Sequence, residues 1–219
     1  MNVTFFDLET TDKEPTANQI LTCYFRTLSL PEYKLVDECY LEFKPVKYRV
    51  ESFAIHGISE KEAKTFPDRW ESFERLLKYM AKHKDSLFCC HANHLSFGSY
   101  GYFDEQVIRG LCFEKSFETY LWFQKQKFQI ISTHTIAKNT MSFENYRQET
   151  IAKGMGIKYK SHEAKSDVMA MVEIFKKLVN KNTTKKQLIK LGNYNEAFKI
   201  KGLPAERREP DEESILRGM

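Results

Sequence analysis

The sequence contains no apolar run long enough to cross a membrane. No stretch approaches the roughly eighteen consecutive apolar residues that a membrane-spanning helix needs, and the first residues lack a basic region followed by a cleavable apolar segment. Internal repeats and low-complexity tracts are also absent from the sequence. We therefore expect a soluble protein that is cytoplasmic or otherwise intracellular and does not bind a membrane.

The cysteines follow no metal-binding or disulfide pattern. There are five of them, an odd number, and none has a metal-binding spacing. We expect reduced thiols within the core. With 219 residues, of which 42% are hydrophobic, the chain can form one moderately large domain with an ample core.

Two carboxylates stand at the end of an apolar segment near the amino terminus. The sequence of residues 5–11, FFDLETT, is typical of a strand. Successive strand side chains point to opposite faces, so Asp7 and Glu9 project from the same face with their Cα atoms roughly 7 Å apart. Such a pair needs a compensating charge, which a divalent cation can supply. A strand that simply ends in a polar turn is the alternative interpretation.

A histidine and an aspartate precede a strongly periodic apolar segment in the last third of the chain. Apolar side chains recur at helical spacing from Met171 to Leu178, which predicts an amphipathic helix over about 164–180. Asp167 lies four residues before Met171, so it is the first residue on the buried face of this helix. His162 precedes Asp167 by five residues, about 140° around a helix, so we expect it in the lead-in loop, over the same pocket. Alternatively, Asp167 is a favourable first-turn anion and His162 an ordinary loop residue.

A third acidic position lies in the middle of the chain. Residues 86–91 are consistent with a short buried strand, a loop rich in glycine and aromatic residues follows at 97–102, and a helix-like stretch begins near Phe103 and Asp104. Asp104 lies where a strand-loop-helix unit could aim its carboxylate. Asp104 could equally be a helix cap.

Three acidic segments in this order, with a histidine five residues before the last aspartate, resemble the DEDD superfamily of 3′-to-5′ exonucleases in its histidine-containing (DEDDh) branch. The first family motif, Asp-x-Glu, matches at Asp7 and Glu9, and the third, His-x-Ala-x-x-Asp, matches at His162, Ala164 and Asp167. A His-Gly-Ile stretch at 56–58 and a glycine turn at 154–157 look like further family features. The resemblance covers about residues 1–180.

The second motif departs from the pattern of many relatives. They place an asparagine only a few residues before Phe-Asp, whereas eleven residues separate Asn93 from Asp104 here. Either the loop at 97–102 is an insertion, or Asn93 is not the counterpart of that asparagine. The stretch from Phe103 to Arg109 looks more like the exonuclease I relatives, in which Phe-Asp is followed by an acidic helix that contains valine.

The resemblance implies a metal site and roles for its residues. Two divalent ions, Mg²⁺ or Mn²⁺, would be bound by Asp7, Glu9, Asp104 and Asp167, with Asp7 bridging both. His162 would be the general base on the attacking water, a role that suits imidazole because it exchanges a proton near neutral pH. Hard cations prefer carboxylate oxygens, and two such ions can assist the nucleophile, the transition state and the leaving oxyanion of phosphodiester hydrolysis.

Several positions are expected to bind the substrate. The resemblance places Leu8, Thr10 and His56 around the terminal nucleotide. Aromatic residues make up 14% of the chain, and such rings could stack on unpaired bases. Phe103 and the tyrosines at 100 and 102 are the candidates for stacking, whereas most other aromatic side chains are expected in the core.

The order of elements predicts an α/β fold. We expect strands at about 2–9, 19–29, 34–44, 86–91 and 128–132, and helices at 69–83, 104–114 and after the last strand. Three strands joined by short turns, followed by alternating helices and strands, suggest a mixed sheet of about five strands flanked by helices. This fits the ribonuclease-H-like fold that the resemblance implies, with Asp7 and Glu9 on the central strand.

The domain organisation is predicted from the resemblance and the charge. An exonuclease domain is expected over 1–180, and a basic helical extension with a flexible tail over 181–219. Ten Lys and Arg stand against two Glu between Lys176 and Arg208, although the whole chain carries a net charge of only +4. Nucleic-acid phosphate is the natural partner of such a segment, and a solvated basic surface is an equal alternative.

These features together predict a metal-dependent 3′-to-5′ exonuclease that acts on single-stranded DNA and releases nucleoside 5′-monophosphates. The same chemistry on RNA is the nearer alternative, because the motifs do not distinguish the sugars. A catalytically silent module that binds nucleic acid or a polymerase is the alternative from another class. A replication or repair protein is a possible partner.

Overall fold

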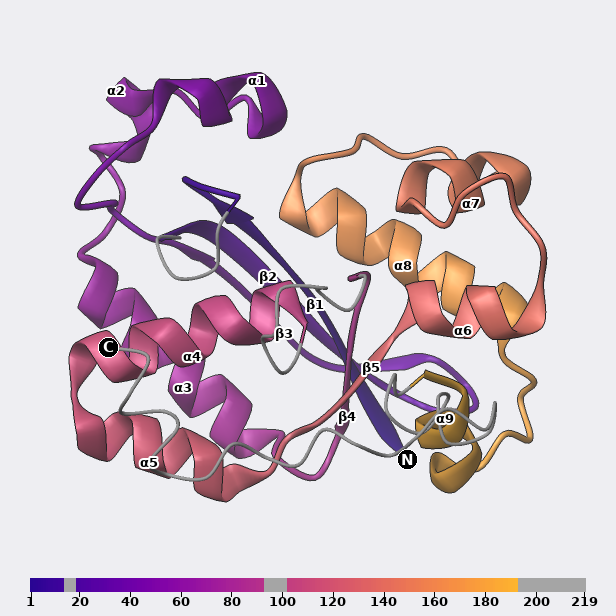
Figure 1. Cartoon of the computed structure of the whole chain (residues 1–219). Helices are drawn as coiled ribbons and strands as arrows, with labels where there is room; N and C mark the ends of the chain where they lie inside the picture. The colour runs from indigo at the N-terminus through magenta and orange to yellow at the C-terminus, as the bar shows by residue number, and fades with distance from the viewer. Residues whose placement is uncertain (14–18, 93–101, 193–219) are drawn as a thin grey trace, which may run out of the picture.

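The described part of the chain is built around one mixed β-sheet (Figure 1). This computed structural model describes residues 1–13, 19–92 and 102–192. Five strands lie in the order β3-β2-β1-β4-β5. They are β1 (Asn2–Thr10), β2 (Ile20–Ser29), β3 (Lys34–Glu42), β4 (Leu87–Cys90) and β5 (Gln129–Ser132).

The sheet combines antiparallel and parallel pairings. β1 pairs antiparallel with β2, and β2 with β3, whereas β1 with β4 and β4 with β5 are parallel pairs. Antiparallel neighbours can be joined by tight turns, but parallel neighbours need long crossovers, which helices provide here. The predicted mixed sheet is confirmed, and β1 is its central strand.

Helices cover both faces of the sheet. Figure 1 shows α3, α4 and α5 on one side, α6 to α9 on the other, and α1 and α2 near one end of the sheet. Their bounds are η1 (Val50–Ser52, a 3₁₀ turn), α1 (Phe53–His56), α2 (Glu60–Ala63), α3 (Arg69–Lys82), α4 (Phe103–Lys115), α5 (Phe117–Gln126), α6 (Thr133–Thr140), α7 (Gln148–Gly154), α8 (Ala164–Leu178) and α9 (Lys185–Gly192). Among these described helices, none is both long and apolar enough to cross a membrane.

The structure confirms most of the predicted elements and adds helices that the sequence did not locate. α3, α4 and α8 lie where helices were expected. α5 was missed because its apolar residues do not form one stripe: Phe117 and Leu121 are exposed, whereas Phe123 is buried. All five cysteines are free and four are buried, which agrees with the expected core thiols.

Alternation along β1 sends its side chains into two separate cores. Phe6 and Leu8 belong to a cluster with side chains of α3, α4 and α5, whereas Val3 and Phe5 belong to a second cluster with side chains of α8 and α9. Asp7 continues the row of Val3 and Phe5, and residue 9 follows it, because side chains alternate every two residues. The strand therefore delivers its carboxylates to the face that α8 covers.

α8 packs its apolar stripe on this face of the sheet. The buried residues Ala164, Val168, Met171 and Phe175 recur every three or four positions. The Phe175 ring is fully buried and meets the Phe5 ring edge-on, with centroids 5.1 Å apart. This contact fixes α8 over β1 and thereby sets where the first turn of α8 lies.

We expect Phe175→Ala to lower the free energy of unfolding by about 3–5 kcal/mol, because it leaves a cavity between α8 and β1. Phe117→Ala is the matched control, since the Phe117 side chain is 57% exposed, and it should cost less than about 1 kcal/mol. Urea unfolding followed by circular dichroism measures both. Equal losses in the two variants would contradict the anchoring role of Phe175.

Candidate metal centre

Three carboxylates from two elements meet near the end of β1. One carboxylate oxygen from each of Asp7, Glu9 and Asp167 lies within 4.8 Å of the other two. Asp7 and Glu9 come from β1, and Asp167 comes from the first turn of α8. The fold thus brings together the first and the third acidic segments, which are about 160 residues apart in the sequence.

Hydrogen bonds hold the Asp167 carboxylate in one orientation. The backbone N–H of Glu163 donates to Oδ2 at 3.0 Å. The side-chain amide of Gln148 donates to Oδ1 at 3.2 Å and to the backbone oxygen of Asp167 at 2.8 Å. Sequence reasoning missed Gln148, because a neutral amide 19 residues before Asp167 shows no spacing that connects the two.

Asp104 approaches the same group from α4. It lies in the first turn of that helix and is 6% exposed. After burial, its charge is the largest cause of the raised pKa of Asp7. Asp104 does not belong to the group of three within 4.8 Å, but its charge acts on both Asp7 and Glu9.

Burial raises the pKa of all four carboxyl groups, and the charges of neighbouring carboxylates add to this rise at Asp7 and Glu9. Burial is the largest cause for each of them, and it holds the pKa of Asp7 well above its usual range together with the charges of its three neighbours. The pKa rises to about 8 for Glu9, about 7 for Asp104 and about 6 for Asp167. At Asp167 the N–H of Glu163 and the charge of His162 oppose the rise.

Basic side chains do not compensate this charge. Within residues 1–13, 19–92 and 102–192, no ion pair joins Asp7, Glu9, Asp104 or Asp167 to a lysine or arginine. A dense set of oxygen donors without a cationic partner is the environment that hard divalent ions prefer. The residues present therefore fit a divalent metal.

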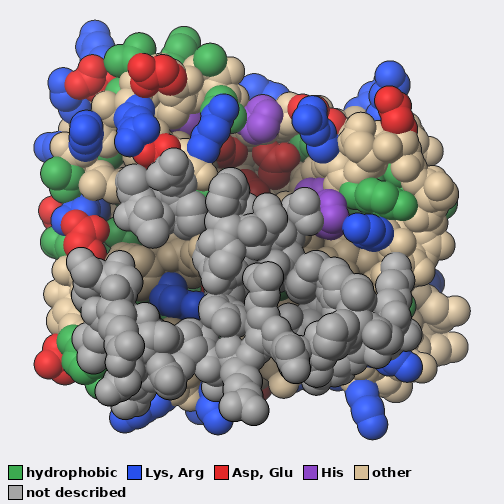
Figure 2. All heavy atoms as spheres, viewed as in Figure 1, with side chains coloured by type: hydrophobic (Ala, Val, Ile, Leu, Met, Phe, Trp, Pro, Cys, Tyr) green, Lys and Arg blue, Asp and Glu red, His purple; other side chains and the backbone are tan. Residues whose placement is uncertain are grey.

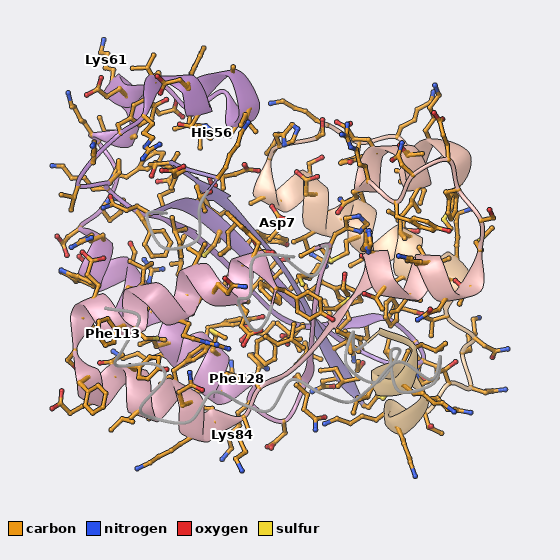
Figure 3. The ribbon with its side chains drawn as sticks, viewed as in Figure 1. Asp7, His56, Lys61, Lys84, Phe113 and Phe128 are labelled. Carbon is orange, nitrogen blue, oxygen red and sulfur yellow. The ribbon has the colours of Figure 1, made fainter. Side chains whose placement is uncertain are left out.

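Two histidines lie at the margin of the carboxylates. His162, in the loop before α8 where it was expected, is exposed and has a φ of 61°, which is uncommon for a residue with a Cβ. Its charge acts on both Asp167 and His56, so the three side chains are neighbours. Figure 3 shows His56 on α1, beyond the end of the strand that carries Asp7.

The hydrogen bonding of His56 defines its tautomer. Its Nδ1 accepts a hydrogen bond from the backbone N–H of Ile58 at 3.0 Å, which leaves the proton of the neutral ring on Nε2. This Nε2 is buried and has no hydrogen-bond partner in the described part of the chain. The His56 ring thus presents an unused N–H donor near His162.

The other predicted substrate-binding residues are placed differently. The Leu8 side chain is 6% exposed and lies in the core on the opposite face from Asp7. Thr10 Oγ1 donates to the backbone oxygen of Asp12 at 2.8 Å. Phe103 is partly buried against the core formed with α3 to α5. Their roles toward a nucleotide stay predictions.

The loop residues expected to stack on bases are only partly described. Tyr102 is 4% exposed, and its hydroxyl donates to the backbone oxygen of Gly192 at 3.0 Å, so its ring belongs to the core. Asn93 and Tyr100 lie outside the described residues. On the surface, Figure 2 shows recessed acidic side chains with histidine side chains beside them.

The fold is ribonuclease-H-like and is similar to that of exonuclease I. A structure of E. coli exonuclease I with a dT13 oligonucleotide superposes with a TM-score of 0.67 at 16% identity, over 82% of this chain and 41% of that chain. A second exonuclease I structure gives 0.66 at 17% identity, over 90% and 43%. An ExoI/SSB-Ct complex gives 0.66 at 17%, over 86% and 42%.

These similarities concern the fold. The chain spans about two fifths of the length of the exonuclease I structures that it matches. No protein-family model matches the sequence, and no curated protein is significantly similar to it. One of the similar structures, a complex of E. coli exonuclease I with single-stranded DNA, contains a zinc ion. The resemblance predicted from the three acidic motifs is thus confirmed in the architecture.

The raised pKa values predict how the metal-free protein responds to pH. A carboxyl group with a higher pKa in the folded chain than in the unfolded chain makes stability fall as pH rises from the unfolded value, about 4, to the folded value. Glu9 and Asp104, with pKa values of about 8 and about 7, still titrate above pH 6.5. The histidines whose pKa is lowered give the opposite slope, but only below about 6.5, namely His56, His91 and His134.

We therefore expect the Tm in EDTA to fall by roughly 5 °C between pH 6.5 and pH 8. Glu9→Gln should remove much of this fall, because the amide does not ionise. Mn²⁺ should raise the Tm more at pH 8 than at pH 6.5, since it binds the ionised carboxylates. Differential scanning fluorimetry measures all three, and a level or rising Tm in EDTA over this range would contradict the electrostatic description.

Proposed function

We propose that the chain is a metal-dependent 3′-to-5′ exonuclease that degrades single-stranded DNA and releases nucleoside 5′-monophosphates. The observation that carries this proposal is a group of four carboxylates, without an ion-pair partner in the described residues, near the end of the central strand of an exonuclease I-like fold. A purely structural role is disfavoured, because buried like charges without partners destabilise the folded state. The E. coli exonuclease I complex with dT13 supports single-stranded DNA as the substrate class.

In this proposal the four carboxylates hold two Mg²⁺ or Mn²⁺ ions. Bound ions of this kind stabilise the negative charge that develops on the nucleophile, the phosphoryl group and the leaving oxygen. The protein contributes a rigid set of donors: Asp7 and Glu9 are fixed by the central strand, and Asp167 is oriented by Glu163 and Gln148. Asp104 supplies the fourth carboxylate from α4.

His162 is the proposed general base. It accepts a proton from the attacking water as the oxygen–phosphorus bond forms, and the bond from phosphorus to the 3′-oxygen of the penultimate nucleotide breaks. The leaving oxygen then takes a proton from solvent. An imidazole suits this role because it can exchange a proton near neutral pH. The exposed position of His162 allows this proton to return to water.

His56 is proposed to bind the terminal nucleotide. Burial, and then the charge of His162, lower the pKa of His56, so its ring is neutral at pH 7. The free Nε2–H is then a donor that can bind an oxygen of the nucleotide without competing with metal ions for the carboxylates. In this proposal His56 donates a hydrogen bond as a neutral ring, whereas His162 accepts a proton from water.

We also propose a protein partner and a role in nucleic-acid binding for the basic segment near the end of the chain. The ExoI/SSB-Ct complex supports an SSB-type protein as a partner. The boundary near residue 180 stays a prediction; α9 lies beyond it, and its Leu188 is fully buried in the cluster under α8. The basic side chains between Lys176 and Lys190 are proposed to contact nucleic-acid phosphate, while the rest of the extension lies outside the described residues.

The test of this function is digestion of matched 5′-labelled single-stranded DNA and RNA in Mg²⁺, Mn²⁺ or EDTA. We expect a ladder that shortens from the 3′ end only with metal, faster on DNA than on RNA, and no cleavage by Asp7→Ala, which lacks a central ligand. Faster digestion of RNA than of DNA would indicate that RNA is the substrate. Intact oligomers under every condition, with metal-independent binding, would establish a silent binding module instead.

His162→Ala should reduce turnover by a factor on the order of 10² to 10⁴, with little loss of DNA affinity, because it removes the base and no ligand. His134→Ala is the control: its ring packs on His91 and Tyr146, and no carboxylate of the metal centre acts on its pKa. Single-turnover digestion and fluorescence anisotropy separate the two effects. An unchanged rate in His162→Ala would exclude it as the base.

A further inference from the structure

Tyr159 occupies a fixed position between the turn after α7 and the start of α8. Gly156, two residues after the end of α7, has a φ of 69°, and the N–H groups of Gly156 and Ile157 donate to the oxygens of Lys153 and Ala152 at 3.1 and 2.8 Å. This hydrogen-bond pattern is the Schellman motif, which turns the chain sharply at a helix end. Tyr159 follows this turn, between the end of α7 and the start of α8.

The Tyr159 ring is held by apolar packing. It contacts the small cluster that includes Ile151, Ala152 and Ile174, together with the partly buried Tyr146. A ring fixed in this way has little freedom to redirect its hydroxyl. The hydroxyl position is therefore a property of the fold rather than of a mobile side chain.

The charges of three carboxylates act on the Tyr159 hydroxyl. Burial, followed by the charges of Asp167, Glu149 and Asp7, raises the pKa of Tyr159. The Gln148 amide lies close enough to oppose this rise, but its hydrogen bonds go to Asp167. The hydroxyl oxygen is itself buried and has no hydrogen-bond partner in residues 1–13, 19–92 and 102–192. A buried hydroxyl without a partner costs free energy, so its presence needs an explanation.

We propose that Tyr159 is a further substrate-binding residue of this site, whose hydroxyl donates a hydrogen bond to a non-bridging oxygen of the phosphate being released. This inference rests on the proposed function and extends it to a residue outside the three acidic motifs. A lysine or arginine at this place would form ion pairs with Asp167 and Asp7 and so compete with metal ions for them. A neutral hydroxyl donates to the anion and leaves the carboxylates free.

The test is binding of the reaction product by Tyr159→Phe, which removes the oxygen and keeps the ring. Titration calorimetry measures the affinity for Mn²⁺ alone, and then for deoxythymidine 5′-monophosphate in saturating Mn²⁺. We expect the affinity for the nucleotide to fall about tenfold or more, because a hydrogen bond to an anion is lost. The affinity for Mn²⁺ should change by less than about twofold, since tyrosine is not among the proposed ligands.

Tyr146→Phe is the matched control. This tyrosine packs against the same apolar cluster, but its hydroxyl donates to the backbone oxygen of Met141 at 3.2 Å. It should bind the nucleotide as the unchanged protein does. Metal-free Tyr159→Phe should be at least as stable as the unchanged protein, because it loses only an unpartnered hydroxyl.

The titrations distinguish failure of this inference from failure of the proposed function. Unchanged nucleotide affinity in Tyr159→Phe would overturn this inference while the proposed function stands. An equal loss of Mn²⁺ and nucleotide affinity would overturn it too, because the hydroxyl would then act on the metal ligands. Absence of nucleotide binding by the unchanged protein, with Mn²⁺ bound, would contradict the proposed function itself.

Discussion

Four carboxylates in a poorly hydrated recess are the constraint on which the rest of the site depends. Burial favours the protonated forms of all four, repulsion adds to this at Asp7 and Glu9, and the described basic side chains form no ion pair with them. A fold keeps such an arrangement only if the surrounding structure holds the groups in place against repulsion. Glu9 and Asp104, with pKa values of about 8 and about 7, would release their protons to solvent when a metal ion binds near neutral pH, so metal binding would be coupled to proton release.

The fold holds these groups in place through two kinds of interaction, apolar packing between elements and hydrogen bonds to the carboxylates. Asp7 lies on the central strand, which is paired on both sides. The contact between the rings of Phe175 and Phe5 packs α8 on the same strand, and Phe175 lies about two helical turns after Asp167. The backbone of Glu163 and the amide of Gln148 then occupy both oxygens of Asp167. Apolar packing therefore positions the elements, and neutral hydrogen bonds orient the carboxylates without cancelling their charge.

The sequence alone predicted the parts of this arrangement that depend on local periodicity. The period of two along β1 placed Asp7 and Glu9 on one face, and the helical period after Asp167 placed that carboxylate on the buried side of α8. What it could not predict depends on tertiary contacts. Leu8 was expected beside the nucleotide from the motif alone, yet the same alternation buries its side chain in the opposite core. Gln148 joins the site only because α7 packs on α8.

The donors at this site are neutral for a physical reason. His56 presents an Nε2–H, and Tyr159 presents an O–H, and both atoms are buried without partners in the described residues. A cationic donor placed among carboxylates would be held by them and would lower their affinity for a metal ion. Neutral donors avoid this competition and still stabilise phosphate charge through directed hydrogen bonds. If metal ions bind in this recess as proposed, the two unsatisfied donors and the carboxylates without an ion pair in the described residues follow from one requirement, namely that the positive charge comes from the metal ions.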